Sequence, residues 1–139
     1  MTVCPACGQA NRLRAEAPGV PHCGRCAAAL PWLVKATASD FEAVVERSPL
    51  PTLIDFWAPW CGPCRMVEPS LERLSLELAG KLKVAKVNTD EEPSLATRFE
   101  ARGIPLLVLV EQGRERDRLV GARSLGELRS WLQQRLPTG

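Results

Sequence analysis

The chain has 139 residues, of which 45% are hydrophobic, and its 18 basic and 16 acidic side chains leave a net charge of +2. This length and apolar content allow one domain of ordinary size with a small appendage. The nearly balanced charge argues against nucleic acid or an anionic membrane as the principal partner. No stretch approaches the length of a membrane span, and the N-terminus lacks the pattern of an export signal, so we expect a cytoplasmic protein.

All six cysteines occur in Cys-x-x-Cys pairs, which in a protein without an export signal favours metal binding and redox chemistry over structural disulfides. Residues 1–30 hold few large apolar side chains, and two of the pairs have the spacing of a four-thiolate zinc site: Cys4, Cys7, Cys23 and Cys26. Gly8 and Gly24 stand where the two turns would need a residue that tolerates positive φ. We therefore predict a zinc-binding ribbon over residues 1–30 and a second domain over residues 31–139. A disordered tail with randomly oxidised thiols is the alternative, and His22 is interpreted as a bystander because four thiolates already complete a site.

Residues 32–34 are predicted to form the first strand of the second domain. Ser39 and Glu42 then have the spacing of a capping box, in which the serine accepts a bond from an early amide and the glutamate reaches back. The expected helix buries one apolar face, formed by Phe41, Val44 and Val45. Pro49 and Pro51 are expected to end it.

Residues 52–58 are predicted to form a buried strand that contains one acidic residue, Asp55. Asp55 falls on the same strand face as Leu53 and Trp57, although Asp has a poor strand propensity. Burial disfavours a carboxylate, so we expect the pKa of Asp55 to rise toward neutrality, which suits a group that accepts a proton from a neighbouring thiol. The alternative is a capping or salt-bridged acid.

Cys61 falls where this strand ends and a helix over residues 61–79 begins. The free N–H groups and the dipole of a helix N-terminus favour the thiolate form of a cysteine, which is the form that attacks disulfides. Cys64 lies one turn further along the same face, where it can close onto Cys61 and resolve a mixed disulfide. We predict Cys61 as the nucleophile and Cys64 as the resolving cysteine. The alternatives are a static disulfide and half of a zinc site. Pro69 is expected to bend the helix.

The elements that follow alternate between strand and helix and then change to a hairpin. A strand at residues 82–87 and a helix at residues 93–101 indicate right-handed parallel crossovers. Residues 106–110 and 116–120 are predicted to pair as a hairpin closed by a Gln-Gly turn, with the charged return strand at a solvated sheet edge. Ser124 and Glu127 then have the spacing of a second capping box, which begins the last helix. This helix has one apolar face, formed by Leu125, Leu128, Trp131 and Leu132.

After the strand that carries Asp55 comes a motif that resembles the active site of the thioredoxin family: Trp60-Cys61-Gly62-Pro63-Cys64. The resemblance covers about residues 31–137 and implies the thioredoxin fold, an α/β fold in which helices flank a mixed sheet in the order βαβαβαββα. The paired cysteines of residues 1–30 resemble the zinc-containing branch of bacterial thioredoxins, in which Zn²⁺ would be structural or redox-sensing.

The resemblance implies roles for further residues. Lys86 would lie beside Asp55 and modulate its titration, although from the residues alone it reads equally well as a surface lysine. A cis proline and small residues would line the groove that receives an extended client segment, which would comprise Trp60, Gly62, Pro63, Ile104, Pro105, Gly121 and Ala122. Without the resemblance, the Ile104-Pro105 bond would be expected to be trans, and the small residues to form a simple turn. Leu106 departs from the threonine usual in the family, which leaves the client preference open.

The activity that the resemblance implies is that of a general protein disulfide reductase, serving redox homeostasis and defence against oxidative stress. Its partners would be disulfide-containing client proteins and an NADPH-linked thioredoxin reductase, which reduces the oxidised cysteine pair again. We expect a monomer with no organic cofactor bound. An oxidase or isomerase is the alternative within this class, and the Gly-Pro between the cysteines favours reduction. The alternative from another class is a binding module in which the ribbon recruits a client and the second domain is a scaffold.

Overall fold

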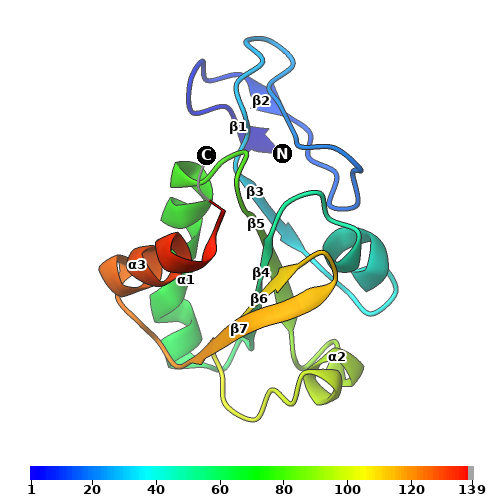
Figure 1. Cartoon of the computed structure of the whole chain (residues 1–139), viewed down its shortest axis with the longest axis vertical. Helices are drawn as coiled ribbons and strands as arrows, with labels where there is room; N and C mark the ends of the chain where they lie inside the picture. Colours follow the sequence, from blue (N-terminus) through cyan, green and yellow to red (C-terminus); the bar gives the residue numbers. More distant parts are fainter. Residues whose placement is uncertain (138–139) are drawn as a thin grey trace.

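The computed structural model describes residues 1–137, so the last two residues of the expected second domain lie outside the described part. Its body is a five-stranded mixed sheet with the strand order β3-β5-β4-β6-β7 (Figure 1). A small sheet of β1 and β2 belongs to the N-terminal segment. The elements in chain order are β1 (Thr2–Val3), β2 (Ala10–Asn11), β3 (Trp32–Lys35), the π-helical turn η1 (Glu42–Glu46), β4 (Thr52–Trp57), α1 (Gly62–Glu77), β5 (Lys83–Asn88), α2 (Pro93–Arg98), β6 (Leu106–Glu111), β7 (Arg114–Val120) and α3 (Leu125–Arg135).

Strand β4 lies at the centre of the sheet and leads directly into α1. It pairs in parallel with β5 and antiparallel with β6, and β5 also pairs in parallel with β3. The predicted parallel crossovers and mixed sheet are therefore confirmed. Asp55 is in register with Lys86 of β5 and with Leu107 of β6. The hairpin partner β7 lies at the sheet edge, where its first three residues are exposed as predicted.

Side chains of the sheet alternate between two faces, and each face has its own hydrophobic core. One core joins Ile54 and Phe56 to η1 and α2. The other joins Leu53 to α1 and α3, which also contact each other. Figure 1 shows α1 and α3 on one side of the sheet and η1 on the other. Because Asp55 has the parity of Leu53, its side chain lies on the α1 side of the sheet.

The predicted capping box at Ser39 is wrong. Within residues 1–137, η1 has no side-chain cap, and the Ser39 hydroxyl instead lies 3.0 Å from that of Thr37. Asp40 reaches back to the Thr37 amide at 2.7 Å, which is the second half of a capping box placed two residues earlier. Glu42 forms an ion pair with Arg47, so its carboxylate is already engaged.

The second predicted capping box is present at the start of α3. The Ser124 hydroxyl accepts a hydrogen bond from the Glu127 amide at 3.1 Å, and the Glu127 carboxylate reaches back to the Ser124 amide. The hairpin turn also forms as predicted, because Gln112 and Gly113 both have positive φ, at 52° and 76°. This is the backbone that a two-residue turn needs in order to match the twist of its strands.

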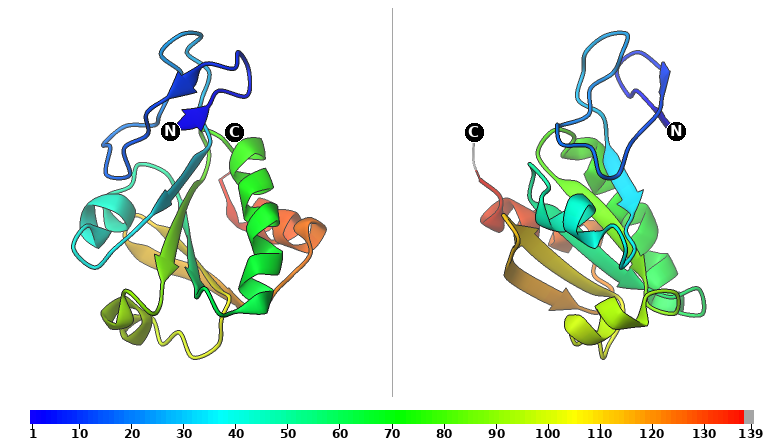
Figure 2. Two further views of the ribbon diagram at one scale, coloured as in Figure 1. Left: turned by 180° about the vertical axis from the view of Figure 1, so that it is seen from behind. Right: turned by 90° about the vertical axis from the view of Figure 1, so that its right-hand side faces the viewer.

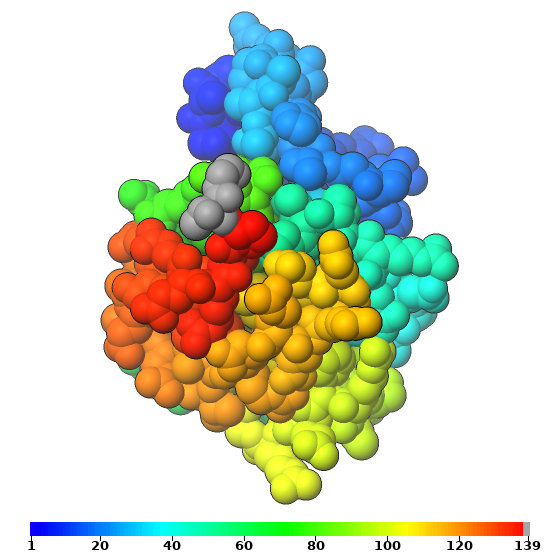
Figure 3. Space-filling view, viewed as in Figure 1, coloured from blue at the N-terminus to red at the C-terminus, as the bar shows by residue number. Residues whose placement is uncertain are grey.

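The N-terminal segment projects from the end of the molecule at which β3 begins (Figures 2 and 3). It is tied to the sheet by Lys83, whose side chain is completely buried. The Lys83 ammonium donates hydrogen bonds to the carbonyl oxygens of Ala15 and Val44 and lies 4.0 Å from the centre of the Trp32 ring. Burial lowers the pKa of Lys83 to about 8. A cation inside the sheet thus holds residues from both parts of the chain.

Candidate functional site

Two cysteines occupy the junction between β4 and α1. Cys61 is the N-cap residue of α1, and its Sγ accepts a hydrogen bond from the Cys64 amide at 3.2 Å. The two residues are joined by a disulfide, with their Cα atoms 5.3 Å apart. Gly62 and Pro63 form the first turn, where proline lacks only an amide that has no intrahelical partner. In the reduced state, the same amide and the helix dipole favour a thiolate at Cys61.

The loop before β6 comes close to this disulfide. The Ile104-Pro105 peptide bond is cis, and the Ile104 carbonyl oxygen lies 3.8 Å from the Cys61 Sγ. The Pro105 carbonyl oxygen accepts a hydrogen bond from the Gly121 amide at 2.8 Å. Of the residues predicted to line a client groove, Ile104 thus contacts Cys61, Gly121 bonds to Pro105, and Ala122 is exposed. Leu106 is buried in the core on the η1 side, so its side chain does not face this groove.

The exposed Trp60 side chain is held by a residue that the sequence analysis missed. Its indole N–H lies 3.1 and 3.2 Å from the two carboxylate oxygens of Asp90, which follows β5. Trp60 is 69% exposed, so a polar anchor rather than burial fixes its orientation beside Cys61. Asp90 is thirty positions away along the chain, and only the fold brings it near.

Asp55 is a buried acid with incomplete hydrogen bonding. It is 1% exposed, and its Oδ1 atom has no hydrogen-bond partner among the described residues. Burial is the main cause that raises its pKa to about 7, while the positive charge of Lys86 opposes the rise and the negative charge of Glu68 adds to it. A carboxyl group with this pKa is half protonated near neutrality, so it is able both to accept and to donate a proton there.

Lys86 lies beside Asp55 in the neighbouring strand, but its ion-pair partner is Glu68 of α1. Its ammonium also lies 4.8 Å from the centre of the Trp57 ring. Glu68 was not among the residues predicted from the sequence. The available signal was its position one helical turn after Cys64, which places an acid on the helix face that covers β4 and β5.

The four remaining cysteines form a second cluster at the opposite end of the molecule. Their Sγ atoms all lie within 4.8 Å of one another, with contacts of 3.6 Å between Cys4 and Cys26 and between Cys7 and Cys23. A tetrahedral zinc ion with Zn–S bonds of about 2.3 Å separates its sulfurs by about 3.8 Å, so the donor set fits such an ion. Cys4 and Cys23 are buried, and the other two cysteines face outward.

Two matching turns present these sulfurs. In the first turn Gly8 has φ of 79° and its amide bonds to the Cys4 carbonyl oxygen, and in the second Ala27 has φ of 65° and bonds to that of Cys23. The expectation of positive φ at Gly24 was therefore wrong, because the residue equivalent to Gly8 is Ala27. The Gly24 amide instead donates to the Asn11 side chain. His22 bonds to the Val20 carbonyl and is not part of the cluster.

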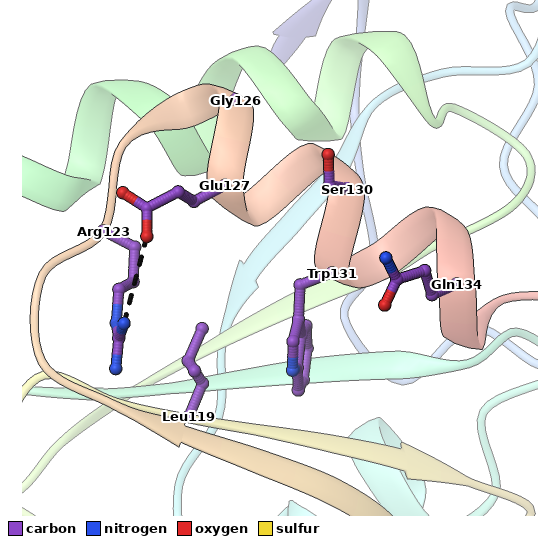
Figure 4. A pocket seen from close by; sticks show the side chains of 7 residues that line it. All are labelled: Leu119, Arg123, Gly126, Glu127, Ser130, Trp131 and Gln134. Atoms are coloured by element: carbon purple, nitrogen blue, oxygen red, sulfur yellow. Dashed lines mark ion pairs between the residues drawn. The ribbon is translucent and has the colours of Figure 1, made fainter.

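Neither of these sites coincides with the hollow between β7 and α3 shown in Figure 4. That hollow has a volume of about 440 Å³, and Leu119 and Trp131 supply its apolar wall. Arg123 and Glu127 form an ion pair at its rim (Figure 4). Within residues 1–137, the helices are too short or too polar to span a membrane.

The sequence of this chain is similar to a known protein-family model and to several known proteins. Residues 32–134 match the protein-family model "Thioredoxin". Thioredoxin 1 of Nostoc sp. is 44% identical over 102 residues, covering 73% of this chain and 95% of that protein. Thioredoxin of Haemophilus influenzae is 43% identical, covering 70% and 92%. Thioredoxin C-3 of Corynebacterium nephridii is 39% identical over 137 residues, covering 96% and 94%, so this similarity extends into residues 1–30.

Proposed function

Because this chain belongs to the thioredoxin family and is a thiol–disulfide oxidoreductase, we propose that it acts as a general protein disulfide reductase. Its place of action is the cytoplasm, where it serves redox homeostasis and defence against oxidative stress. The observation that carries this proposal is Cys61 at the N-cap of α1, with the Cys64 amide on its sulfur and the Ile104 carbonyl 3.8 Å away. A nucleophile, a resolving thiol and a backbone edge for a client lie within one small region.

The reaction proceeds by two exchanges that move two electrons from the cysteine pair to the client. The Cys61 thiolate attacks a client disulfide, forming a mixed disulfide and releasing one client sulfur as a thiolate. The Cys64 thiol gives its proton to ionised Asp55, and its sulfur attacks Cys61, which breaks the mixed disulfide and releases the second client sulfur. The Cys61–Cys64 disulfide remains, and an NADPH-linked thioredoxin reductase reduces it for the next turnover.

Client binding depends on the surface around Cys61. An extended client segment adds to the backbone edge at Ile104 and Pro105, as a strand adds to a sheet. Trp60, Gly62 and Pro63 contribute one side of this groove, and Gly121 and Ala122 the other. A groove that recognises backbone and leaves side chains free suits a reductase with many clients. The protein acts as a monomer and binds no organic cofactor.

Residues 1–30 form a ribbon unit that binds one Zn²⁺ through Cys4, Cys7, Cys23 and Cys26. The fit of the four sulfurs to a tetrahedral ion supports this assignment. When bound, zinc supplies a structural cross-link between two turns that have little core of their own. The thiolates also make the ribbon a candidate redox sensor, since their oxidation would release the ion.

Trapping of mixed disulfides tests the assignment of the two active cysteines. A Cys64→Ser variant lacks the resolving thiol, so it should accumulate mixed disulfides with clients, whereas Cys61→Ser should accumulate none. Trapped complexes are counted on non-reducing gels, and turnover is measured as insulin reduction coupled to NADPH oxidation by thioredoxin reductase. Both variants should lose turnover. Equal trapping by the two variants would reject the assignment, and a wild-type protein that shows no turnover would favour the scaffold alternative.

A further inference from the structure

The geometry points to Glu68 as a positioning residue for the reaction: its carboxylate holds the Lys86 ammonium and so keeps that cation from pairing with Asp55. The inference rests on the proposed function, in which Asp55 accepts the proton of Cys64. It assigns a purpose to an acid that neither touches the cysteines nor belongs to the client groove. Glu68 lies on α1 one turn after Cys64 and is partly exposed.

The contacts of Lys86 carry the argument. Lys86 and Asp55 are in register on adjacent parallel strands, and their side chains share the α1 side of the sheet. Adjacent strands lie about 4.8 Å apart, so a flexible lysine in this position is within reach of the acid. Its ammonium is nevertheless paired with Glu68, and Asp55 Oδ1 has no hydrogen-bond partner among residues 1–137. Two carboxylates thus compete for one cation, and the one nearer to solvent holds it.

The charged and titratable groups near Asp55 are few. Among residues 1–137, the charges that act on Asp55 are those of Lys86 from β5 and Glu68 from α1. Cys61 and Cys64 lie at the N-terminal end of α1, and β6 opposes Asp55 with the apolar Leu107. Next to Lys86, β3 supplies Lys35, which is engaged at 3.1 Å with Glu91. Lys86 is therefore the cation best placed to stabilise ionised Asp55, and Glu68 is the acid that holds the Lys86 ammonium away from Asp55.

Removing the Glu68 charge should change Asp55 in a defined direction. Without that carboxylate the ammonium is free to turn toward Asp55, where an opposite charge at short range favours the ionised acid. Asp55 would then hold protons less tightly and become a poorer acceptor for the Cys64 proton at neutral pH. With Glu68 present, the buried acid keeps a proton affinity close to that required for exchange with a thiol.

The test is a carboxyl-carbon NMR titration of Asp55 in the oxidised protein, in which neither Cys61 nor Cys64 titrates. In Glu68→Gln, the Asp55 midpoint should fall by about one pH unit. Glu68→Ala, which also removes the acceptor, should lower it at least as far. Glu72→Gln is the matched control, because Glu72 lies one turn further along α1, is exposed and makes the same change in net charge. Its midpoint should move by a few tenths of a unit or less.

A Lys86→Met background shows whether the effect passes through the lysine. There Glu68→Gln should shift the Asp55 midpoint by less than half as much as it does beside Lys86. An unchanged midpoint in Glu68→Gln, or an equal shift in both backgrounds, would overturn the inference. The pH profile of insulin reduction is measured alongside. If the midpoint falls while the profile stays in place, the hold of Glu68 on Lys86 stands, but the role of Asp55 as proton acceptor is rejected, and with it the part of Glu68 in the reaction.

Discussion

A buried acid at the centre of the sheet places a free-energy cost on this protein. Asp55 keeps its proton up to a pH of about 7, whereas in an unfolded chain it loses the proton near pH 4. Between these values the native state binds more protons than the unfolded state, so the free energy of unfolding falls as the pH rises. Above pH 7 the whole cost is present. The pKa of Asp55 differs by about three units between the native and the unfolded state, which lowers the free energy of unfolding by about 4 kcal/mol at most.

Replacing Asp55 by asparagine should separate this cost from the chemistry. Asp55→Asn removes the ionisable group, so the free energy of unfolding should rise by about 1–3 kcal/mol at pH 8, since the buried amide offsets part of the gain. At pH 4 the difference from the wild-type protein should be small. Turnover in insulin reduction should fall about tenfold or more, because Cys64 loses its proton acceptor.

Denaturant unfolding at the two pH values, with the cysteine pair oxidised, measures the first effect. A variant that is strongly destabilised yet fully active would show that Asp55 is a structural residue instead. Both the residue and its burial were predictable from sequence, because a single acid interrupts an apolar strand. The ion-pair partner of Lys86 was not predictable from sequence. Glu68 and Lys86 are eighteen positions apart, and only the packing of α1 against β5 brings them together.

At the scale of single elements, local patterns predicted most of the fold. The strands, the hairpin with its Gln112-Gly113 turn and the helix after the Cys61 junction follow from periodicity and turn residues that the chain carries within each segment. The two serine capping boxes had equal support, yet only Ser124 caps its helix. Near Ser39, the Asp40 carboxylate accepts a hydrogen bond from the Thr37 amide, which is half of a capping box in an overlapping pair with the same three-residue spacing. The spacing alone cannot distinguish between overlapping pairs.

Alanine substitutions at the two serines should therefore differ. Ser124→Ala leaves an early amide of α3 without its side-chain acceptor and should lower the free energy of unfolding by about 1 kcal/mol. Ser39→Ala removes only an exposed contact between hydroxyl groups and should change it by less than about 0.5 kcal/mol. Paired chemical denaturation of both variants measures this. Equal losses would contradict the assignment of the caps.

At the scale of the whole molecule, two cysteine sites lie at opposite ends of one sheet. The Cys61–Cys64 disulfide follows the carboxyl end of β4, and the four-cysteine cluster precedes β3 (Figure 1). This separation means that the proposed zinc binding and the disulfide exchange would use different thiols and can be measured independently. The spacing of the cluster was enough to predict it, whereas the link through Lys83 required the fold.

Freshly purified protein should contain one tightly bound zinc per chain. The cysteine thiols must lose their protons to bind the ion as thiolates, so its affinity should fall as the pH is lowered. Cys7→Ser should lower the zinc content well below one equivalent after gel filtration, while Cys64→Ser, which alters the other site, should retain it. Elemental analysis gives the content. Little zinc in the wild-type protein, with all four ribbon thiols freely titratable, would show that the cluster is not a zinc site.

The buried ammonium of Lys83 limits how freely the two parts of this protein can be exchanged between relatives. Its hydrogen bond to Ala15 crosses from the sheet to the N-terminal segment, beneath the Trp32 ring. A chimaera that grafted residues 1–30 onto a member of the fold without a lysine at the position of Lys83 would leave the Ala15 carbonyl group without this hydrogen-bond donor. Replacing residues 1–30 of this chain by those of a relative would leave the buried Lys83 ammonium with only one of its two carbonyl acceptors, that of Val44. An exchange of residues 1–30 between relatives therefore has to include Lys83, although this residue lies far from that segment in the sequence.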